Sequence, residues 1–506
     1  MKNRIRILAT SDVHGYIYPY SYADGKSADH GFARLSTMIN SLRDSSTILI
    51  DNGDTLEGSP LSYYHYHTKP DQVSSVTKVM NYIGYDYINL GNHDFSYGEE
   101  ALFTHLNNIK APCITSNIKF KGKPFAPTYV IRETEGRKVA LFALVTQHIP
   151  NWEPKHHIRH FRFQDAFETA KKTARLIRDL ENPDYVICIY HGGFERDLKT
   201  GMATEEQTGE NEGYRILKEI PGIDILIAGH QHQSKCGTAF GKAYTETAAD
   251  GRELACIDIY TDTGIIEPKL IPVDTDPKQA VLDLAQDEED ECQIWLDQTL
   301  GTCRTDLKVR DEFDARLHKS QIITFLNMVA KEASGADICS CALFNGAVGF
   351  NTSITMRDIV STYVFPNTLV VKKVTGRILR EYLEKNAEFW SQAGGRIIVS
   401  PQYDYPTPMH FNYDMADGIE YTIKVSNDPG ERIVSLTRNG EEITDDMEFT
   451  LCVNNYRAGG GGNFNMIKDA PTVKEIQTGM VELIADRLNR ESEISFEPVN
   501  NIQVIL

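Results

Sequence analysis

Five short clusters of polar residues in the first half of the chain carry side chains that could bind metal ions. Each cluster directly follows a short apolar run. Together they supply carboxylate, amide and imidazole donors but no thiolate: Asp12, His14, Asp54, Asn92, His191, His230 and His232. Oxygen and imidazole donors suit Mn²⁺, Fe²⁺ or Zn²⁺ and argue against Ca²⁺. The residue types therefore predict a site for one of the first three ions.

The number of donors is enough for two metal ions. Each ion needs about four protein ligands, and one carboxylate can bridge a pair. Two ions roughly 3.5–4 Å apart can activate a hydroxide and hold a phosphoryl group. A purely structural metal would use fewer ligands and a closed shell. We therefore expect two catalytic divalent ions, and the residue types leave Mn²⁺, Zn²⁺ and Fe²⁺ open as their identity.

The segments before the clusters have the composition of buried strands. They are short, apolar and β-branched, they end abruptly, and they cover residues 5–9, 47–50, 87–90, 185–189 and 224–228. Patterns with helical spacing separate them, at residues 32–43, 73–83, 99–107 and 163–180. Alternating strands and helices indicate an α/β domain, in which ligands bind beyond the carboxyl ends of the strands. Every polar cluster falls at such an end, so we expect the site in a first domain of residues 1–276.

A different pattern begins after this domain. Residues 277–309 are acidic and begin with helical spacing, which predicts a linker helix. Residues 310–506 form a predicted second domain of the α+β class. Its expected helices cover residues 320–333, 376–390 and 474–489, and its expected strands cover residues 420–425, 433–438 and 449–453. The turn Arg438-Asn439-Gly440-Glu441 is typical of a β-hairpin.

Composition excludes several classes of function. The 506 residues carry a formal charge of −19, which argues against a protein that coats long nucleic acid. The longest apolar run, residues 139–145, is too short to cross a bilayer. The nine cysteines include no CxxC pair, so we expect reduced thiols and a cytoplasmic location. No signal peptide precedes the first strand, although a secreted protein trimmed of its signal would look the same.

The order of the polar clusters is similar to a known signature. Asp12-x-His14, Gly53-Asp54, Gly91-Asn92-His93-Asp94, His191 and Gly229-His230-x-His232 resemble the motifs of calcineurin-like metallophosphoesterases. Residues 363–369 and 454–460 resemble the C-terminal domain of the 5′-nucleotidase superfamily. Residues 51–60 are most similar to its 2′,3′-cyclic-nucleotide 2′-phosphodiesterase/3′-nucleotidase branch. The resemblance covers nearly the whole chain and implies an αββα sandwich followed by a nucleotidase-type α+β domain.

The resemblance also assigns roles to single residues. One metal would be held by Asp12, His14, Asp54 and His232. The other would be held by Asp54, Asn92, His191 and His230, so that Asp54 bridges the pair. His93 is not a ligand in this pattern. It would face the substrate and stabilise or protonate the leaving oxygen, which suits a group that titrates near neutral pH.

Two departures from the 5′-nucleotidase pattern bear on the substrate. In 5′-nucleotidases the third residue after the catalytic His is an Asp that pairs with it, whereas this chain has Ser96. A hydroxyl can orient the imidazole of His93 but should hold its proton less firmly than a carboxylate. The matching Gly-rich stretch, residues 344–350, also lacks the Arg that grips a terminal phosphate. Both departures favour a cyclic phosphate or a 3′-phosphate.

Phe365 and Tyr456 are the positions at which this branch would stack the nucleobase. Asn345, in the Gly-rich stretch 344–350, and Asn367, in the motif 363–369, are further expected substrate-binding residues. The alternative for the aromatic pair is an ordinary place in the core. Tyr413 and Phe464 are weaker candidates of the same kind. Irregular spacing indicates a solvated loop for the His-rich residues 148–160 and for the Tyr-rich segment around His65 and His67. Residues 459–462 are a Gly-rich loop, either flexible or closely approached by a ligand.

These interpretations predict a two-metal phosphohydrolase. It would open 2′,3′-cyclic nucleotides to 3′-nucleotides and then hydrolyse the 3′-nucleotides to nucleosides. A 5′-nucleotidase or nucleotide-sugar hydrolase on the same scaffold is the nearest alternative, and a metal-dependent nuclease is a more distant one. A non-catalytic nucleotide-binding module is the alternative from another class. The expected partner is a small nucleotide, without membrane or long nucleic acid, and the oligomeric state is left open.

Overall fold

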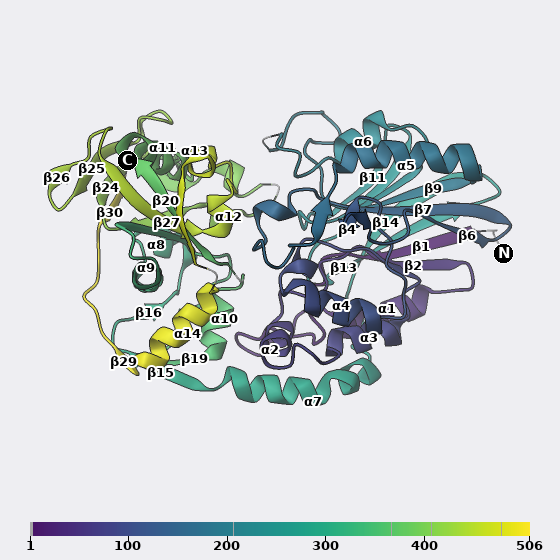
Figure 1. Cartoon of the computed structure of the whole chain (residues 1–506), viewed down its shortest axis with the longest axis horizontal. Helices are drawn as coiled ribbons and strands as arrows, with labels where there is room; N and C mark the ends of the chain where they lie inside the picture. Colours follow the sequence, from purple (N-terminus) through teal and green to yellow (C-terminus); the bar gives the residue numbers. More distant parts are fainter. Residues whose placement is uncertain (1–3, 206, 366, 406, 477) are drawn as a thin grey trace. The chain divides into compact units, whose positions relative to one another are not determined.

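The computed structural model describes residues 4–205, 207–365, 367–405, 407–476 and 478–506. The chain divides into two compact units, Met1–Gln293 and Ile294–Leu506 (Figure 1). The division falls inside the acidic helix α7 (Gln279–Leu296), which lies in the region predicted as a linker helix. Each unit mixes helices and strands, which confirms the predicted α/β class for the first and α+β class for the second.

The first unit contains two mixed β-sheets. In the first sheet three parallel strands are followed by two antiparallel ones, in the order β3 (Tyr87–Ile88), β2 (Thr47–Asp51), β1 (Arg4–Thr10), β13 (Glu253–Tyr260) and β14 (Ile265–Pro272). In the second sheet four parallel strands lie between two antiparallel edges, in the order β6 (Val130–Thr134), β7 (Arg137–Val145), β9 (Tyr185–His191), β10 (Ile225–Ala228), β12 (Lys242–Glu246) and β11 (Lys235–Ala239). Strand β7 contains the apolar run noted in the sequence.

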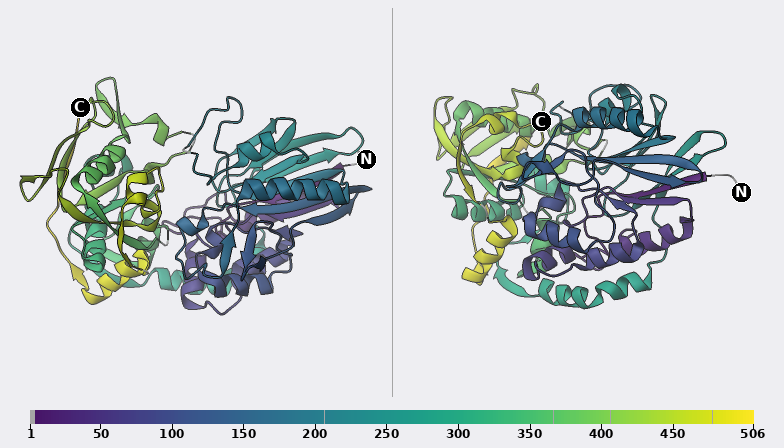
Figure 2. Two further views of the ribbon diagram at one scale, coloured as in Figure 1. Left: turned by 45° about the horizontal axis from the view of Figure 1, so that its top comes forward. Right: turned by 45° about the vertical axis from the view of Figure 1, so that its right-hand side comes forward.

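The two sheets pack face to face around a shared apolar core. Ile5, Ile7 and Ala9 of β1 lie in one buried cluster with Val139 and Leu141 of β7. The alternate residues of β7 pack on the other face, against helices α5 (Ala166–Glu181) and α6 (Gly213–Glu219). This period of two explains why β7 is apolar throughout. Helices α1 (Phe32–Leu42) and α3 (Ser75–Ile83) cover the outer side of the first sheet, which completes the predicted αββα sandwich (Figures 1 and 2).

The acidic residues of α7 are used to hold the helix on the first unit. Glu288 accepts a hydrogen bond from the backbone nitrogen of Ser75 at 2.9 Å and pairs with the imidazole of His65. Glu289 accepts one from the hydroxyl of Tyr22 at 2.7 Å. Buried carboxylates need such partners. His65 is therefore buried in helix α2 (Pro60–Thr68), and the interpretation of its segment as a solvated loop was wrong.

The main sheet of the second unit has five strands. Their order is β23 (Asp414–Asp417), β17 (Ile338–Ala342), β27 (Glu448–Asn454), β20 (Leu369–Thr375) and β28 (Thr472–Ile476). Helices α9 (Gln321–Ser334) and α11 (Gly376–Ala387) pack on it. The predicted last helix begins later than expected, because its first residues form the edge strand β28 and helix α14 covers Met480–Arg490.

The predicted hairpin turn is confirmed. Arg438 pairs with Glu441 across strands β25 (Ile433–Arg438) and β26 (Glu441–Glu442). Asn439 and Gly440 both have positive φ, at 54° and 81°. Two consecutive positive φ angles are what a two-residue hairpin turn requires, and an Asn-Gly pair supplies them at low cost.

Strand register brings four loops of the second unit to one edge of the sheet. Strands β17 and β27 run parallel, so the residues after them emerge at the same edge. Strand β20 is antiparallel to β27, with Leu369 opposite Asn454, so the residues before it lie at this edge too. Ala342 is opposite Asp414, which adds the loop before β23. The edge therefore collects residues 343–348, 363–365, 367–368, 410–413 and 455–463.

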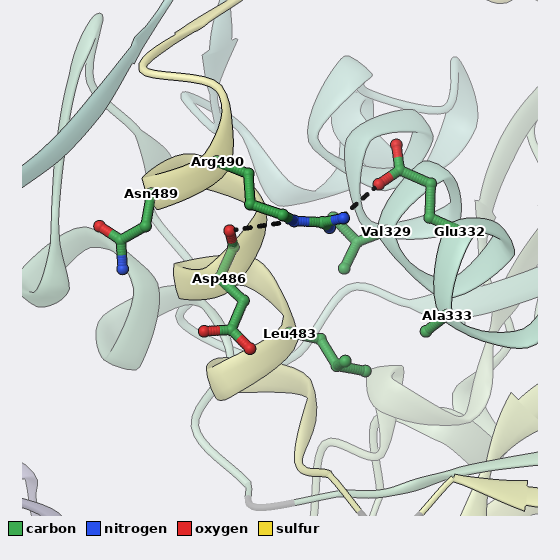
Figure 3. Close-up of a pocket in the computed structure, with 7 residues that line it drawn as sticks. All are labelled: Val329, Glu332, Ala333, Leu483, Asp486, Asn489 and Arg490. Carbon is green, nitrogen blue, oxygen red and sulfur yellow. Dashed lines mark hydrogen bonds and ion pairs between the residues drawn. The ribbon is translucent and has the colours of Figure 1, made fainter.

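A separate groove lies between helices α9 and α14 (Figure 3). Its volume is about 540 Å³, and its lining is Val329, Glu332, Ala333, Leu483, Asp486, Asn489 and Arg490. The guanidinium of Arg490 lies 3.5 Å from Glu332 across the groove. None of the predicted site residues lines it. Over the described parts of the chain, no helix is both long and apolar enough to cross a membrane.

Candidate metal centre

Four of the predicted ligands form one group of donor atoms in the first unit. They are Asp12, His14, Asp54 and His232, each with one donor atom within 4.8 Å of those of the others. The Nε2 atoms of His14 and His232 are 3.1 Å apart, and Oδ1 of Asp12 is 3.4 Å from Nε2 of His232. The residues come from the loops after β1, β2 and β10. Donors this close together can share a single cation.

A second group contains Asp54 again, with His191 and His230. Asn92 joins it through Oδ1, which lies 2.8 Å from Nδ1 of His230 and 3.2 Å from Nε2 of His191. The structure therefore brings all seven predicted metal ligands together, in two groups that share the carboxylate of Asp54. Their assignment as ligands stays a prediction.

One buried atom at the junction of the two groups tests whether a cation fits. Oδ2 of Asp54 is buried, and apart from an ion pair with Nε2 of His191 at 3.1 Å no residue that the structure describes donates to it. When His191 is neutral, this carboxylate oxygen has no positive partner, and a cation would satisfy it. The donor set and this oxygen fit a divalent metal.

The backbone of the site is unusual. Five of the seven predicted ligands have positive φ: Asp12 at 57°, His14 at 54°, Asp54 at 54°, His230 at 74° and His232 at 57°. A non-glycine residue in this left-handed region costs roughly 1–2 kcal/mol. Such strain persists where the surrounding structure enforces it, most often at functional sites. Here it turns each side chain back toward the common centre just after its strand ends.

Glycines in the motifs allow the loops to pack against one another. A Cβ on Gly91 would lie 2.1 Å from Oδ1 of Asp54 and 2.6 Å from Cε1 of His191. A Cβ on Gly229 would lie 2.8 Å from Oδ2 of Asp12. Both glycines directly precede a predicted ligand. Any side chain there would push the two metal-ligating loops apart.

Hydrogen bonds fix which nitrogen of each imidazole faces the centre. Nδ1 of His14 lies 2.8 Å from the carbonyl oxygen of Glu57, and Nδ1 of His191 lies 2.8 Å from that of Asn52. A carbonyl can only accept, so Nδ1 donates in both and Nε2 is directed at the cluster. His230 is turned the other way, because its Nε2 lies 3.2 Å from Oε1 of Glu210. Partners of this kind orient metal-bound histidines.

The charges within the metal-free cluster stabilise one another. Burial alone would raise the pKa of Asp12, but nearby His191 and His232 lower it to about 2. The pKa of Asp54 is also lowered well below its usual range, against the effect of burial, chiefly by His191. Burial would lower the pKa of His191, but Asp54 and Asp12 raise it to about 9. At neutral pH the imidazolium of His191 therefore stands where a metal ion would provide the positive charge.

Metal binding to the metal-free protein should therefore release protons. His191 is protonated at pH 7 and must lose its proton to become a ligand. We expect release of at least one proton at pH 7, because Asp12 also raises the pKa of His232 against the effect of burial, and little release above pH 9, where the His191 imidazole is already neutral. Apparent affinity should rise about tenfold per pH unit between these values. Calorimetric titration with Mn²⁺ in buffers of different ionisation enthalpy measures the release. A pH-independent affinity without proton release would contradict this account.

His93 lies beside the cluster and outside both donor groups. Its ring centroid is 5.5 Å from that of His14, and its backbone nitrogen donates to Oδ1 of Asp54 at 2.7 Å. Nδ1 lies 2.5 Å from Oε2 of Glu57. Burial would lower the pKa of His93, but Glu57 and Asp54 raise it to about 10. The predicted leaving-group histidine is thus a cation in the metal-free protein.

Ser96 occupies a different place from the one expected. Its hydroxyl donates to Oε1 of Glu153 at 3.0 Å, while the carboxylate of Glu57 contacts Nδ1 of His93. The prediction that His93 lacks a carboxylate partner was therefore wrong. The partner precedes His93 in the chain, whereas the prediction considered only a residue that follows it. The preference for a cyclic phosphate loses one of its two supports.

Asp94, whose role the sequence left open, organises the loop that carries Asp54. Its carboxylate accepts hydrogen bonds from four backbone nitrogens, those of Asp54, Thr55, Leu56 and Gly91, at 2.8–3.0 Å. Burial, followed by the charge of Asp54, raises its pKa to about 6. Asp94 directly follows His93 in the sequence, which made it a candidate for a role in the site. The backbone nitrogens that it binds could be identified only from the fold.

The His-rich residues 148–160 are only partly solvated: residues 150, 151, 155, 156 and 159 are exposed, whereas others pack on the site. Trp152 stacks on the predicted ligand His230, with ring centroids 5.3 Å apart and an interplanar angle of 26°. Glu153 is the acceptor for Ser96 and lies 3.7 Å from Nδ1 of His157. The segment packs against the metal cluster. The sequence did not predict that Trp152 stacks on His230, because such stacking requires no particular spacing between the two residues along the chain.

The predicted substrate residues of the second unit lie in the loops collected at one sheet edge. Phe365 is half-buried and contacts Phe344 edge-to-face, with centroids 5.3 Å apart. Tyr456 is half-buried and contacts Phe411 at 6.3 Å. Asn345 is exposed and donates to the carbonyl oxygen of Pro408. Asn367 lies in the loop before β20, where its carbonyl oxygen accepts from the backbone nitrogen of Met480 at 2.9 Å.

The two weaker aromatic candidates belong to the core. Tyr413 is fully buried and stacks on Phe389, with centroids 4.8 Å apart. Phe464 is fully buried beneath the guanidinium of Arg457, which lies 3.8 Å from its ring centroid. Neither ring has an exposed face for a base, unlike the partly exposed Phe365.

The Gly-rich loop is closely approached by the protein's own side chains. A Cβ on Gly461 would lie 2.4 Å from the Tyr456 ring, and one on Gly462 would lie 2.5 Å from Nη1 of Arg457. Arg457 is buried and forms a two-point ion pair with Asp414, at 2.6 and 3.1 Å. Gly461 therefore covers part of the Tyr456 ring, and the buried ion pair anchors the loop.

Comparisons with known proteins agree with this architecture. Residues 5–234 match the family described as Calcineurin-like phosphoesterase, and residues 300–469 match the 5′-nucleotidase C-terminal domain. A crystal structure from Staphylococcus aureus, assigned as a 5′-nucleotidase, is 32% identical, with a TM-score of 0.92. The alignment covers 99% of this chain and 100% of that one.

Two curated relatives are more distant. The trifunctional nucleotide phosphoesterase protein YfkN of Bacillus subtilis is 25% identical over 98% of this chain, which spans only 38% of that protein. The 2′,3′-cyclic-nucleotide 2′-phosphodiesterase/3′-nucleotidase of Salmonella typhimurium is 25% identical over 90% of this chain and 81% of its own length. The predicted resemblance is confirmed. The chain belongs to the calcineurin-like phosphoesterases that carry a 5′-nucleotidase C-terminal domain.

Proposed function

We propose that the protein is a two-metal phosphohydrolase that opens 2′,3′-cyclic nucleotides to 3′-nucleotides and then converts these to nucleosides. The observation that carries the two-metal assignment is the sharing of Asp54 by two groups of metal-binding side chains. Relatives with this named activity, at about 25% identity, support the choice of substrate. The proposed ligands of one ion are Asp12, His14, Asp54 and His232, and those of the other are Asp54, Asn92, His191 and His230.

The residues around the metals have separate tasks in this proposal. Bound divalent cations lower the pKa of water and polarise phosphoryl oxygens. His93 donates from Nδ1 to Glu57, so its Nε2 is the nitrogen that can give a proton to the departing oxygen. When the bond between phosphorus and the 2′ oxygen breaks, that proton neutralises the developing alkoxide. Phe365 and Tyr456 bind the nucleobase by stacking, which tolerates any base.

A 5′-nucleotidase is the second candidate. Glu57 gives His93 a carboxylate partner at 2.5 Å, which removes one difference from the 5′-nucleotidase pattern. The relative assigned as a 5′-nucleotidase is also the 32% identical structure. Against this stands the absence of any Arg from residues 344–350, which leaves this loop without a two-point clamp for a terminal phosphate.

One parallel assay tests the choice. The Mn²⁺-loaded protein is given 2′,3′-cyclic AMP, 3′-AMP, 5′-AMP and UDP-glucose at equal concentrations. We expect the highest kcat/KM for 2′,3′-cyclic AMP and turnover of 3′-AMP by the same site. A higher kcat/KM for 5′-AMP would overturn the proposed substrate in favour of the second candidate. Activity on none of the four would overturn both.

Removal of the stacking aromatics should weaken nucleotide turnover selectively. Each stack is worth ~1–3 kcal/mol by alanine substitution, or roughly 5- to 150-fold in kcat/KM. Phe365→Ala and Tyr456→Ala should each cause a loss in this range for 2′,3′-cyclic AMP. Both variants should hydrolyse bis-p-nitrophenyl phosphate at nearly the wild-type rate, because that compound has no base to stack.

The control is Tyr82→Ala, which removes an exposed tyrosine from helix α3 of the first unit. It should leave both substrates unaffected. An equal decline on both substrates in the Phe365 and Tyr456 variants would mean damage to the fold. No decline on either substrate would place the base elsewhere.

A further inference from the structure

We propose that Glu57 is the positioning residue for His93, and that it supplies from another loop the carboxylate that residue 96 lacks. This inference rests on the proposed function, because it assigns a task within phosphoester cleavage. Oε2 of Glu57 lies 2.5 Å from Nδ1 of His93, and the Glu57 side chain is 3% exposed. A buried carboxylate at this distance from an imidazole nitrogen is a strong, charge-assisted partner.

The backbone of Glu57 has a second contact within the site. Its carbonyl oxygen accepts a hydrogen bond from Nδ1 of His14 at 2.8 Å. Gly58 has φ 139°, and a Cβ there would lie 2.6 Å from Cβ of His14. The peptide at residues 57–58 is therefore packed directly on a predicted metal ligand. Glu57 connects the leaving-group histidine to the metal cluster through one rigid segment.

The segment before Glu57 is equally constrained. The backbone nitrogens of Asp54, Thr55 and Leu56 all donate to the carboxylate of Asp94, at 2.9–3.0 Å. Asp94 is itself 3% exposed. Because this loop has little freedom, the carboxylate of Glu57 is held in place before a substrate binds. Such preorganisation is what a reacting group needs from its supporting residues.

The contact determines which nitrogen of His93 can act on the substrate. An ionised carboxylate only accepts, so the hydrogen on Nδ1 points at Glu57 and Nε2 is the reactive nitrogen. In the cleavage step the hydrogen on Nε2 passes to the leaving oxygen, and the hydrogen on Nδ1 stays on the ring. A glutamine in its place could donate to Nδ1 and turn the hydrogen-bonding pattern of the ring around. Glu57 thus acts through His93 and never on the substrate.

Glu153 provides a matched control for the charge of Glu57. It is a second nearly buried carboxylate close to His93, but it contacts the hydroxyl of Ser96 at 3.0 Å and the imidazole of His157 at 3.7 Å. Glu153→Gln removes the same charge from the same neighbourhood, but it leaves the hydrogen-bond acceptor of the His93 imidazole in place. General electrostatics would give both variants the same phenotype, whereas positioning would affect only the Glu57 variant.

The kinetic experiment compares leaving groups of different acidity on the Mn²⁺-loaded protein. Glu57→Gln should lower kcat for phosphate esters with alkyl leaving groups ~10²- to 10⁴-fold, the usual range for acid catalysis. For p-nitrophenyl esters, which leave without a proton, the loss should be less than ~10-fold. Glu153→Gln should change both by less than ~3-fold, and both variants should retain the wild-type metal content. An equal loss on both ester series, or none, would overturn the proposal.

A measurement on the unchanged protein covers the case in which Glu57→Gln fails to fold. In the ¹⁵N spectrum of histidine-labelled, Zn²⁺-loaded protein, Nδ1 of His93 should carry a hydrogen whether the ring is charged or neutral. A ring that carries its hydrogen on Nε2 alone would overturn the proposal. Neither experiment uses a nucleotide, so failure of the cyclic-nucleotide assignment leaves both outcomes interpretable.

Discussion

Asp54→Asn should abolish turnover and lower the metal content below two equivalents. Asp54 is the one residue common to both donor groups, and apart from the ion pair with His191 its Oδ2 has no donor among the described residues. An amide would replace the shared negative charge by a neutral group that cannot bridge two cations. Because bound metals contribute several kcal/mol of transition-state stabilisation, we expect a loss of roughly 10³-fold or more. Elemental analysis and a bis-p-nitrophenyl phosphate assay measure the two effects.

Asp258→Asn is the matched control. Asp258 is also a buried aspartate of the first unit, but it pairs with Arg6 at 2.7 Å and lies in neither donor group. This variant should keep its metals and its activity even if its stability falls. Two full equivalents of metal in an active Asp54→Asn protein would refute the bridging role.

The location of the donor residues could be predicted because it depends on local sequence. Each apolar run before a cluster forms a strand, and Asp12 and His191 lie at or just after the carboxyl ends of β1 and β9. The meeting of the two sheets could not be derived in the same way. It depends on packing between Ile5 of β1 and Val139 of β7, which are far apart in the chain. Only the family resemblance supplied that step.

The partner of His93 shows where reasoning along the chain fails. Ser96 is three residues away, whereas Glu57 is 36 residues earlier and reaches the ring because β2 and β3 are neighbours in one sheet. The left-handed backbone of predicted ligands such as His232 was equally hidden, since a positive φ is uncommon for every residue other than glycine, although histidine is enriched there. Strain of this kind is imposed by tertiary structure and leaves no local signal.

The second unit illustrates the same limit in its secondary structure. Residues 474–476 were predicted to begin the last helix, but they belong to β28, which pairs with the edge of β20. The contact between Gly461 and the Tyr456 ring likewise follows from the loop's anchoring by Arg457. The sequence motifs therefore predicted candidate substrate residues such as Tyr456. Their positions in the second unit depend on contacts between residues far apart in the chain.

His93→Ala should keep both metals and lose ~10²- to 10⁴-fold in rate on 2′,3′-cyclic AMP, as expected when a general acid is removed. His93 lies outside both donor groups, so its removal leaves every proposed ligand in place. The loss should shrink for p-nitrophenyl esters, whose leaving group needs no proton. His318→Ala, which removes an exposed histidine of the second unit, is the control and should change neither activity. Loss of metal from the His93 variant would count against its role.

The double variant separates His93 from the residue that positions it. If Glu57 acts only through the imidazole, Glu57→Gln should cause a large loss in the wild-type protein and almost none in the His93→Ala background. Such strong non-additivity is expected of groups that work as a unit. The distance of 2.5 Å between Oε2 of Glu57 and Nδ1 of His93 leaves little room for an independent effect. Multiplicative losses would mean instead that the Glu57 carboxylate acts independently of the imidazole, and that His93 acts without it.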